Sequence, residues 1–183
     1  MSLAGFFVNP SRFHARFVGD KMKVVGEDLF AGIQIDSSDV GRSKLDIKFF
    51  VYKQVCTNGL ILPEKAGNIF MQKHIGISSE KMAVSLRESF DDFGSQVRGA
   101  SSLIDKAREI DLSDNVNLFN HIKNGAKVGD DTVDRIFEVA SLNYGMSVWG
   151  IVNAITEVSQ SYTLEHRLLM ERYAGVLLTQ LIK

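Results

Sequence analysis

The sequence predicts an α+β fold, in which a small antiparallel, hairpin-rich sheet is followed by a long helix and a C-terminal helical bundle. Alternating apolar and polar residues at 29–36 and 45–56 indicate two half-buried strands. After Gly76 the apolar spacing changes to three and four residues, which is the period of a helix. A chain of 183 residues with 45% hydrophobic content is long enough to bury a core.

Both strands have one apolar side. In the first strand Leu29, Ala31, Ile33 and Ile35 oppose Phe30, Gln34 and Asp36, and in the second Leu45, Ile47, Phe49 and Val51 oppose Asp46, Lys48, Phe50 and Tyr52. The segment 37–44 is small, polar and glycine-containing, which suits a connecting loop, so we expect the two strands to pair antiparallel.

Further strands are predicted around this pair. Asn58-Gly59 separates 55–57 from 60–62, and this dipeptide favours a two-residue type I′ hairpin turn. Residues 68–75 suit another strand, and 13–18 give a weaker first one.

A long helix is predicted from Ser78 or Ser79 to about residue 110. Its apolar stripe consists of Met82, Leu86, Phe90, Phe93, Val97, Ala100, Ile104 and Ala107. Gly94 and Gly99 each cost about 1 kcal/mol inside a helix, so we expect a kink or a break there.

Shorter helices are expected at 113–124, 131–143, 147–159 and from 163 to the end. Asp130, Asp131, Ser147 and Thr163 are the candidate N-caps. We expect a strand-rich unit with the long helix at 1–110 and a helical subdomain at 111–183, or one continuous domain. Because the chain ends within a helical pattern, we also expect it to be part of a longer protein.

Composition limits the classes of partner. The net charge of −1 gives no global basic field for nucleic acid or membrane. A single cysteine and an N-terminus without a basic n-region predict a cytoplasmic protein. No apolar stretch approaches the roughly 18 residues that span a bilayer, so we expect no membrane partner.

Motifs for known chemistry are missing from the sequence. The four histidines lie far apart, there is no cysteine pair, and the phosphate-binding, dinucleotide-binding and serine-esterase motifs do not occur. We therefore expect no enzyme, no metal and no cofactor. Cys56 is either a nucleophile beside a tight turn or, by preference, a small buried side chain. The pairs Asp91-Asp92 and Asp130-Asp131 suit a solvated helix face and a helix start better than acid/base work.

Basic and aromatic residues occur together from the end of the predicted loop into the second strand. They are Arg42, Lys44, Lys48, Phe50, Tyr52 and Lys53. Such a surface binds single-stranded nucleic acid through stacking and phosphate contacts. The alternative is that the long helix covers this face.

Three segments resemble a family from phages, prophages and plasmids, domain of unknown function 932. They are Asp28 to Gly41, Val51 to Leu60, and Trp149 to Thr156 followed by Glu171 to Gly175. The signature positions are Ser38, Gly41, Cys56, Thr57, Asn58, Gly59, Trp149, Asn153, Thr156 and Gly175. The resemblance implies a mobile-element protein and names no catalytic residue. Strands followed by one long helix is also the order of elements in phage single-strand annealing proteins, which is a likeness of fold alone.

Three functional hypotheses follow. The leading one is a non-catalytic phage or plasmid accessory protein that binds single-stranded DNA in recombination or replication. The second is a non-catalytic protein-interaction module that self-associates through its helices. The third is an enzyme that uses Cys56 with His74, which requires the two side chains to meet in a cleft.

Overall fold

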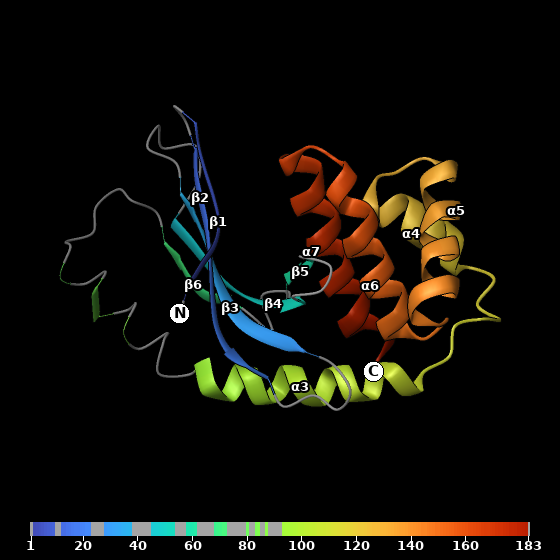
Figure 1. Cartoon of the computed structure of the whole chain (residues 1–183), viewed down its shortest axis with the longest axis horizontal. Coiled ribbons are helices and arrows are strands. Elements are labelled where there is room, and N and C mark those ends of the chain that lie inside the picture. Colours follow the sequence, from blue (N-terminus) through green and yellow to red (C-terminus); the bar gives the residue numbers. More distant parts are fainter. Residues whose placement is uncertain are drawn as a thin grey trace.

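The chain folds as an antiparallel sheet followed by helices, which confirms the predicted α+β class (Figure 1). The computed structural model describes residues 2–9, 12–22, 28–37, 45–53, 58–61, 68–72, 80, 83–84, 87 and 93–182. The strands are β1 (Ser2–Asn9), β2 (Arg12–Lys21), β3 (Leu29–Ser37), β4 (Leu45–Lys53), β5 (Asn58–Ile61) and β6 (Asn68–Gln72). The helices are α3 (Phe93–Glu109), α4 (Leu118–Ala126), α5 (Asp130–Val139), α6 (Val148–Val158) and α7 (Leu164–Leu181).

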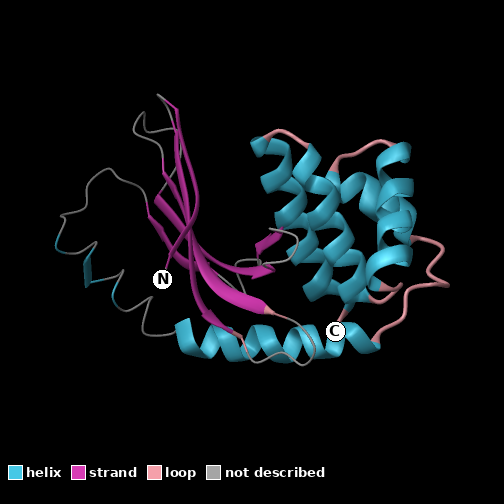
Figure 2. Ribbon diagram, viewed as in Figure 1, coloured by secondary structure: helices cyan, strands magenta, loops and turns pink. Residues whose placement is uncertain are grey.

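The described strands form one sheet in the order β1-β2-β3-β4-β5, and β6 also pairs with β4 (Figure 2). The predicted pairing of β3 with β4 is confirmed, with Ile33 opposite Phe49 and Gln34 opposite Lys48. Because side chains alternate along a strand, this register gives the sheet one apolar and one polar face. The apolar face carries Leu29, Ala31, Ile33, Ile47, Phe49 and Val51, all of them buried.

The predicted two-residue turn at Asn58-Gly59 is wrong. Asn58 pairs with Lys53, so the chain reverses between these two residues and the dipeptide lies in β5. The observed register places Leu60 opposite Val51, and both side chains are buried. Burial of the apolar face therefore decides the register against the local turn preference.

The outer strands agree only in part with the sequence analysis. Strand β2 extends the weak prediction at 13–18, and β6 confirms the strand at 68–75 as far as Gln72. Strand β1 was not predicted. Its residues include adjacent Phe6 and Phe7 and do not alternate cleanly between polar and apolar, which is the signal that the prediction requires.

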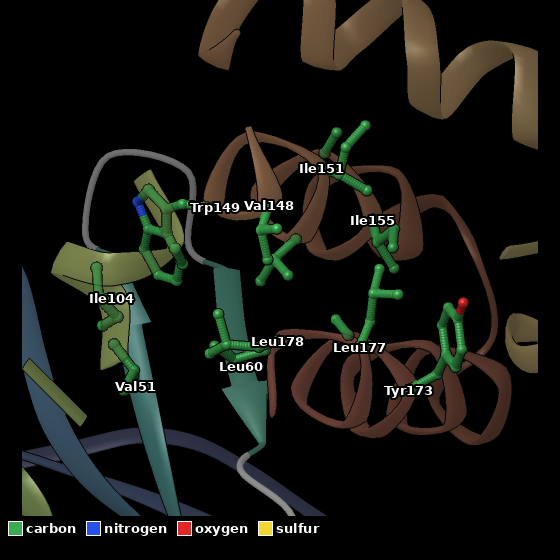
Figure 3. Packing of buried hydrophobic residues seen from close by; sticks show 14 of the residues in the cluster. Val51, Leu60, Ile104, Val148, Trp149, Ile151, Ile155, Tyr173, Leu177 and Leu178 are labelled. Atoms are coloured by element: carbon green, nitrogen blue, oxygen red, sulfur yellow. The ribbon is translucent and has the colours of Figure 1, made fainter. Parts of the chain in front are cut away.

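Helix α3 covers the second half of the helix predicted at 78–110 and runs from Phe93 to Glu109 without interruption, so the expected break does not occur at Gly99. In the first half, residues 80, 83–84 and 87 are described and are helical, whereas the residues directly before Phe93 lie outside the described part, so a break beside Gly94 stays a prediction. Its stripe is confirmed, because Ala100, Ile104 and Ala107 are buried. Figure 3 shows Ile104 next to Val51, which places α3 against the apolar face of the sheet.

The C-terminal helices follow the predicted order. Ser147 caps α6 as expected, since its side chain accepts a hydrogen bond from the backbone N–H of Gly150. Helix α4 starts five residues later than predicted, and a π-helical turn at Ala140–Tyr144 continues α5. Helix α6 is buried from Val148 to Thr156, and α6 and α7 both contact β5. One cluster of buried apolar residues thus extends from the sheet through α3 into the helical part.

Candidate functional site

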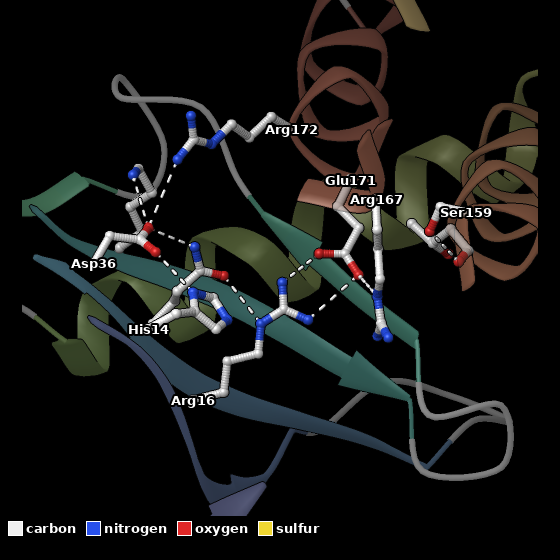
Figure 4. A network of polar contacts seen from close by, with 10 residues as sticks. His14, Arg16, Asp36, Ser159, Arg167, Glu171 and Arg172 are labelled. Carbon is white, nitrogen blue, oxygen red and sulfur yellow. Dashed lines mark hydrogen bonds and ion pairs between the residues drawn. The ribbon is translucent and has the colours of Figure 1, made fainter. Parts of the chain in front are cut away.

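A network of charged side chains joins the polar face of the sheet to α7 (Figure 4). The strand register aligns His14 and Arg16 on β2 with Asp36 and Gln34 on β3, and those two with Asp46 and Lys48 on β4. Helix α7 adds Arg167, Glu171 and Arg172. We call these nine residues the sheet–α7 network.

Arg16 and Glu171 form its centre. The two terminal nitrogens of the Arg16 guanidinium donate to the two carboxylate oxygens of Glu171, one of them at 3.3 Å. Its Nε donates to Gln34 Oε1 at 3.0 Å, and the guanidinium lies 5.2 Å from the centre of the Phe50 ring. Arg167 donates to the same carboxylate at 2.9 Å. Glu171 is therefore fully buried between two arginines, which offsets the cost of burying its charge.

Asp36 is the second centre of the network. It accepts hydrogen bonds from His14 and Gln34, each at 2.7 Å, and from Lys48 at 3.4 Å, and Arg172 approaches to 3.6 Å. Burial alone would raise the pKa of Asp36. The hydrogen bonds from His14 and Gln34 and the charge of Lys48 outweigh burial and hold this pKa well below its usual range.

The network holds charge in place and offers little chemistry. Its basic groups each face a carboxylate or an amide oxygen of the network, and Lys48 also donates to Asp46. Among its described polar atoms only Asp46 Oδ1 is buried without a partner. Groups that are already paired in this way stabilise the contact between sheet and helix, because breaking such a pair would leave a buried charge.

The predicted nucleic-acid surface is wrong for two of its residues. Lys48 is 7% exposed and Phe50 is fully buried, so no base can stack on Phe50. The polar network explains this, because α7 engages their face of the sheet through Glu171, whereas α3 packs on the opposite, apolar face. Of Tyr52 and Lys53 the structure describes the backbone, opposite Phe30 and Leu29. Arg42 and Lys44 lie outside the described residues.

The signature positions fall into two groups. Ser38, Gly41, Cys56 and Thr57 lie outside the described residues, as does His74, so the third hypothesis stays a prediction. Asn58 and Gly59 lie in β5. Trp149, Asn153, Thr156 and Gly175 are buried in α6 and α7. The Asn153 amide donates to the Trp149 carbonyl at 2.8 Å, and the Thr156 hydroxyl to the Asn153 carbonyl at 2.9 Å. These polar groups are satisfied within their own helix, so the buried positions serve packing.

A second candidate site lies in the helical part, where a hollow is open to solvent. An open hollow of about 740 Å³ is lined by the polar residues Asn115, Asn117, Asn120, His121 and Asn124. Leu118, Gly125 and Leu181 complete its wall. We call it the α4 depression, because most of these residues lie on α4. Among the described residues, the side-chain amides of Asn117, Asn120 and Asn124 make no hydrogen bond to protein.

This site was not predicted from the sequence. Its signal is present, since Asn117, Asn120, His121 and Asn124 stand at the spacing of one helix face within the helix predicted at 113–124. That this face lines a hollow depends on Leu181, which comes from the end of α7 and lies far away in the sequence.

Tyr173 lies behind the α4 depression. Its ring centre is 6.0 Å from that of His121, and a Cβ atom added to Gly125 would come within 1.9 Å of the Tyr173 ring. The Tyr173 hydroxyl is buried, and in the described part of the chain it has no hydrogen-bond partner. Burial raises the pKa of this phenol, so the ring stays neutral. Gly125 is thus the residue that lets α4 approach α7 closely.

Among the described residues, His, Cys, Asp and Glu do not gather in groups of three or more that suit a metal ion. No helix in this part of the chain combines the length and apolar character needed to cross a bilayer.

Comparison with protein-family models, with curated proteins and with solved structures finds no match to this chain, so the resemblance to domain of unknown function 932 stays a prediction.

Proposed function

We propose that this chain is a non-catalytic binding protein that takes a neutral, polar ligand in the α4 depression. The observation that carries the proposal is the gathering of side-chain amides that make no hydrogen bond to protein on one face of α4. Each primary amide offers two donors and an acceptor, so the three of them fix the orientation of a ligand that has both kinds of group.

The chemistry of the lining supports binding over catalysis. Amides neither gain nor lose a proton near neutral pH, and His121 is the one titratable side chain that lines the hollow. General acid–base or nucleophilic catalysis needs a second group within reach of such a histidine. The nearest described ring to His121 is Tyr173, whose hydroxyl stays neutral.

The charge of the surroundings supports a neutral ligand. Among the described residues, no Lys, Arg, Asp or Glu lines the α4 depression. Residues 111–183 hold six Lys and Arg against nine Asp and Glu, which is a net charge of −3. Phosphate groups are repelled by such a field, so nucleic acid is disfavoured at this site.

The proposal is tested by titration of the isotope-labelled full chain with three probes. The probes are an N-acetylated, C-amidated heptapeptide, maltotriose and a thymidine oligonucleotide, and the side-chain amide signals of Asn117, Asn120 and Asn124 are followed by NMR. We expect at least one probe to move these signals, and we expect Asn120→Ala to weaken the binding of that probe. Asn143→Ala is the matched control, because Asn143 is an exposed asparagine outside the depression. If no probe moves the three amides of the folded chain, the proposal is wrong.

A further inference from the structure

We infer that the ligand of the α4 depression is a polypeptide segment in extended conformation, held mainly by its main chain. This inference rests on the proposed function and names the class of ligand. It depends on the spacing of the amides, on the apolar part of the wall and on the charges that the wall lacks.

The spacing of the amides fits a main chain. At about 1.5 Å of rise per residue, Asn120 lies about 4.5 Å along the axis of α4 from Asn117, and Asn124 about 6 Å further. An extended polypeptide advances about 3.3 Å per residue, so a row of about 10.5 Å runs beside roughly three peptide units. A side-chain amide carries the same donor and acceptor as a peptide group, so each asparagine can pair with the N–H and C=O of the ligand.

The wall also offers apolar contacts for a side chain. The partly exposed Leu181 lines the hollow beside the amides, as does Leu118, which is itself buried in the core. Between the lining residues Asn115 and Asn117, the Val116 side chain is 89% exposed. Exposed apolar groups beside a row of amides suit a ligand in which polar peptide groups alternate with side chains.

The same wall fits other polymers less well. Single-stranded nucleic acid needs cations for its phosphates and several aromatic faces for its bases, whereas the described lining residues include no Lys or Arg and offer a single aromatic ring, that of His121. A sugar could use the amides. A straight row along a helix, however, matches a linear chain whose amides repeat at short intervals better than a compact ring.

The test compares two forms of one peptide. The probe is Ac-Ser-Ala-Leu-Ser-Ala-Leu-Ser-NH₂, and its partner carries N-methyl groups at alternate residues, which removes amide donors and keeps every side chain. We expect the parent peptide to move the amide signals of Asn117, Asn120 and Asn124, and the methylated form to bind at least about tenfold more weakly. Permuting the order of the side chains should change the affinity by less than about threefold. Asn120→Ala should weaken the parent peptide, whereas Asn143→Ala should not.

The outcomes separate this inference from the proposed function. Equal binding of the methylated and parent peptides would overturn main-chain recognition. If maltotriose or the thymidine oligonucleotide moved the amide signals and the peptide did not, the inference of a polypeptide ligand would be overturned. The proposed binding site would be upheld. Silence from all three probes would overturn both. Thermal melting of each variant shows whether it is folded, and Asn117→Ala serves in place of Asn120→Ala if that variant does not fold.

Discussion

Arg16 on β2 and Glu171 on α7 are 155 positions apart, yet their side chains form a buried ion pair with two parallel contacts. We expect Glu171→Ala to lower the free energy of unfolding by about 3–5 kcal/mol, because it leaves the Arg16 guanidinium buried without its carboxylate. Replacing both partners, Arg16→Met with Glu171→Leu, should cost much less. Urea denaturation measures both. The exposed pair Arg135–Glu138 gives the control, where Glu138→Ala should cost no more than about 1 kcal/mol.

A second prediction concerns stability in acid. The pKa of Asp36 is lower in the folded chain than in the unfolded chain, so its contribution to stability is complete above the unfolded pKa and is lost as the pH falls below it. We expect the melting temperature of the native chain to fall steeply below about pH 4. The Asp36→Asn variant should be less stable than the native chain at pH 7, and its melting temperature should fall less than that of the native chain on acidification. Melting curves from pH 7 to pH 2 measure this.

The control for that experiment removes a carboxylate elsewhere. Glu138→Gln takes one acidic group from the exposed face of α5 and leaves the sheet–α7 network intact. Its acid dependence should follow that of the native chain. If Glu138→Gln flattened the curve as much as Asp36→Asn, the effect would belong to the total charge and not to Asp36.

The close approach of α4 and α7 gives a third prediction. Gly125→Ala should destabilise the chain by about 1–3 kcal/mol, because the added Cβ would come within 1.9 Å of the Tyr173 ring. Tyr173→Leu should recover part of that loss in the double variant. Gly99→Ala is the matched control: nothing lies within 4 Å of its added Cβ, so it should stabilise α3 by about 0.5–1 kcal/mol. Chemical denaturation compares the three, and equal losses at both glycines would contradict the steric explanation.

A fourth prediction separates the structural role of Lys48 from DNA binding by Arg42 and Lys44. Lys48→Met should lower stability by about 1–3 kcal/mol, since Lys48 is buried between Asp36 and Asp46, and it should not alter retention on single-stranded DNA. If Arg42 and Lys44 bind DNA, reversing their charges should weaken salt-sensitive retention without a loss of stability. A DNA-binding defect in folded Lys48→Met would contradict the structural role given to this side chain.

Local patterns predicted the faces of the sheet well. The alternation in 29–36 and 45–56 indicated that Gln34 and Lys48 share one face and Ile33 and Phe49 the other, and the observed register agrees. Alternation is enforced by burial on one side, so it survives in the sequence. The same pattern left open whether the polar face was covered, and that depends on α7, which lies more than a hundred residues away.

Features that depend on distant partners could not be predicted. No local sequence pattern around Arg16 indicates that its partner is Glu171. Likewise, no pattern around Gly125 indicates the Tyr173 ring, whose close approach requires a glycine there. At Asn58-Gly59 a local preference gave the wrong turn, because the burial of Leu60 beside Val51 is a property of the whole sheet. The row of asparagines on α4 fits the predicted helix at 113–124, but the hollow that it lines is completed by Leu181 of α7, which no local pattern indicates.

Glu171 follows all six described strands in the sequence, and this affects the order of assembly. Ribosomes make proteins from the N-terminus, so all six strands leave the tunnel before the carboxylate that Arg16 requires has been synthesised. Until then the polar face of the sheet is exposed to solvent. Docking of α7 removes water from this face. Because the contact between Arg16 and Glu171 spans 155 positions, it forms slowly compared with the local pairing of the strands. A nascent chain stalled before residue 171 would therefore leave Arg16 accessible to solvent, with its side chain still mobile.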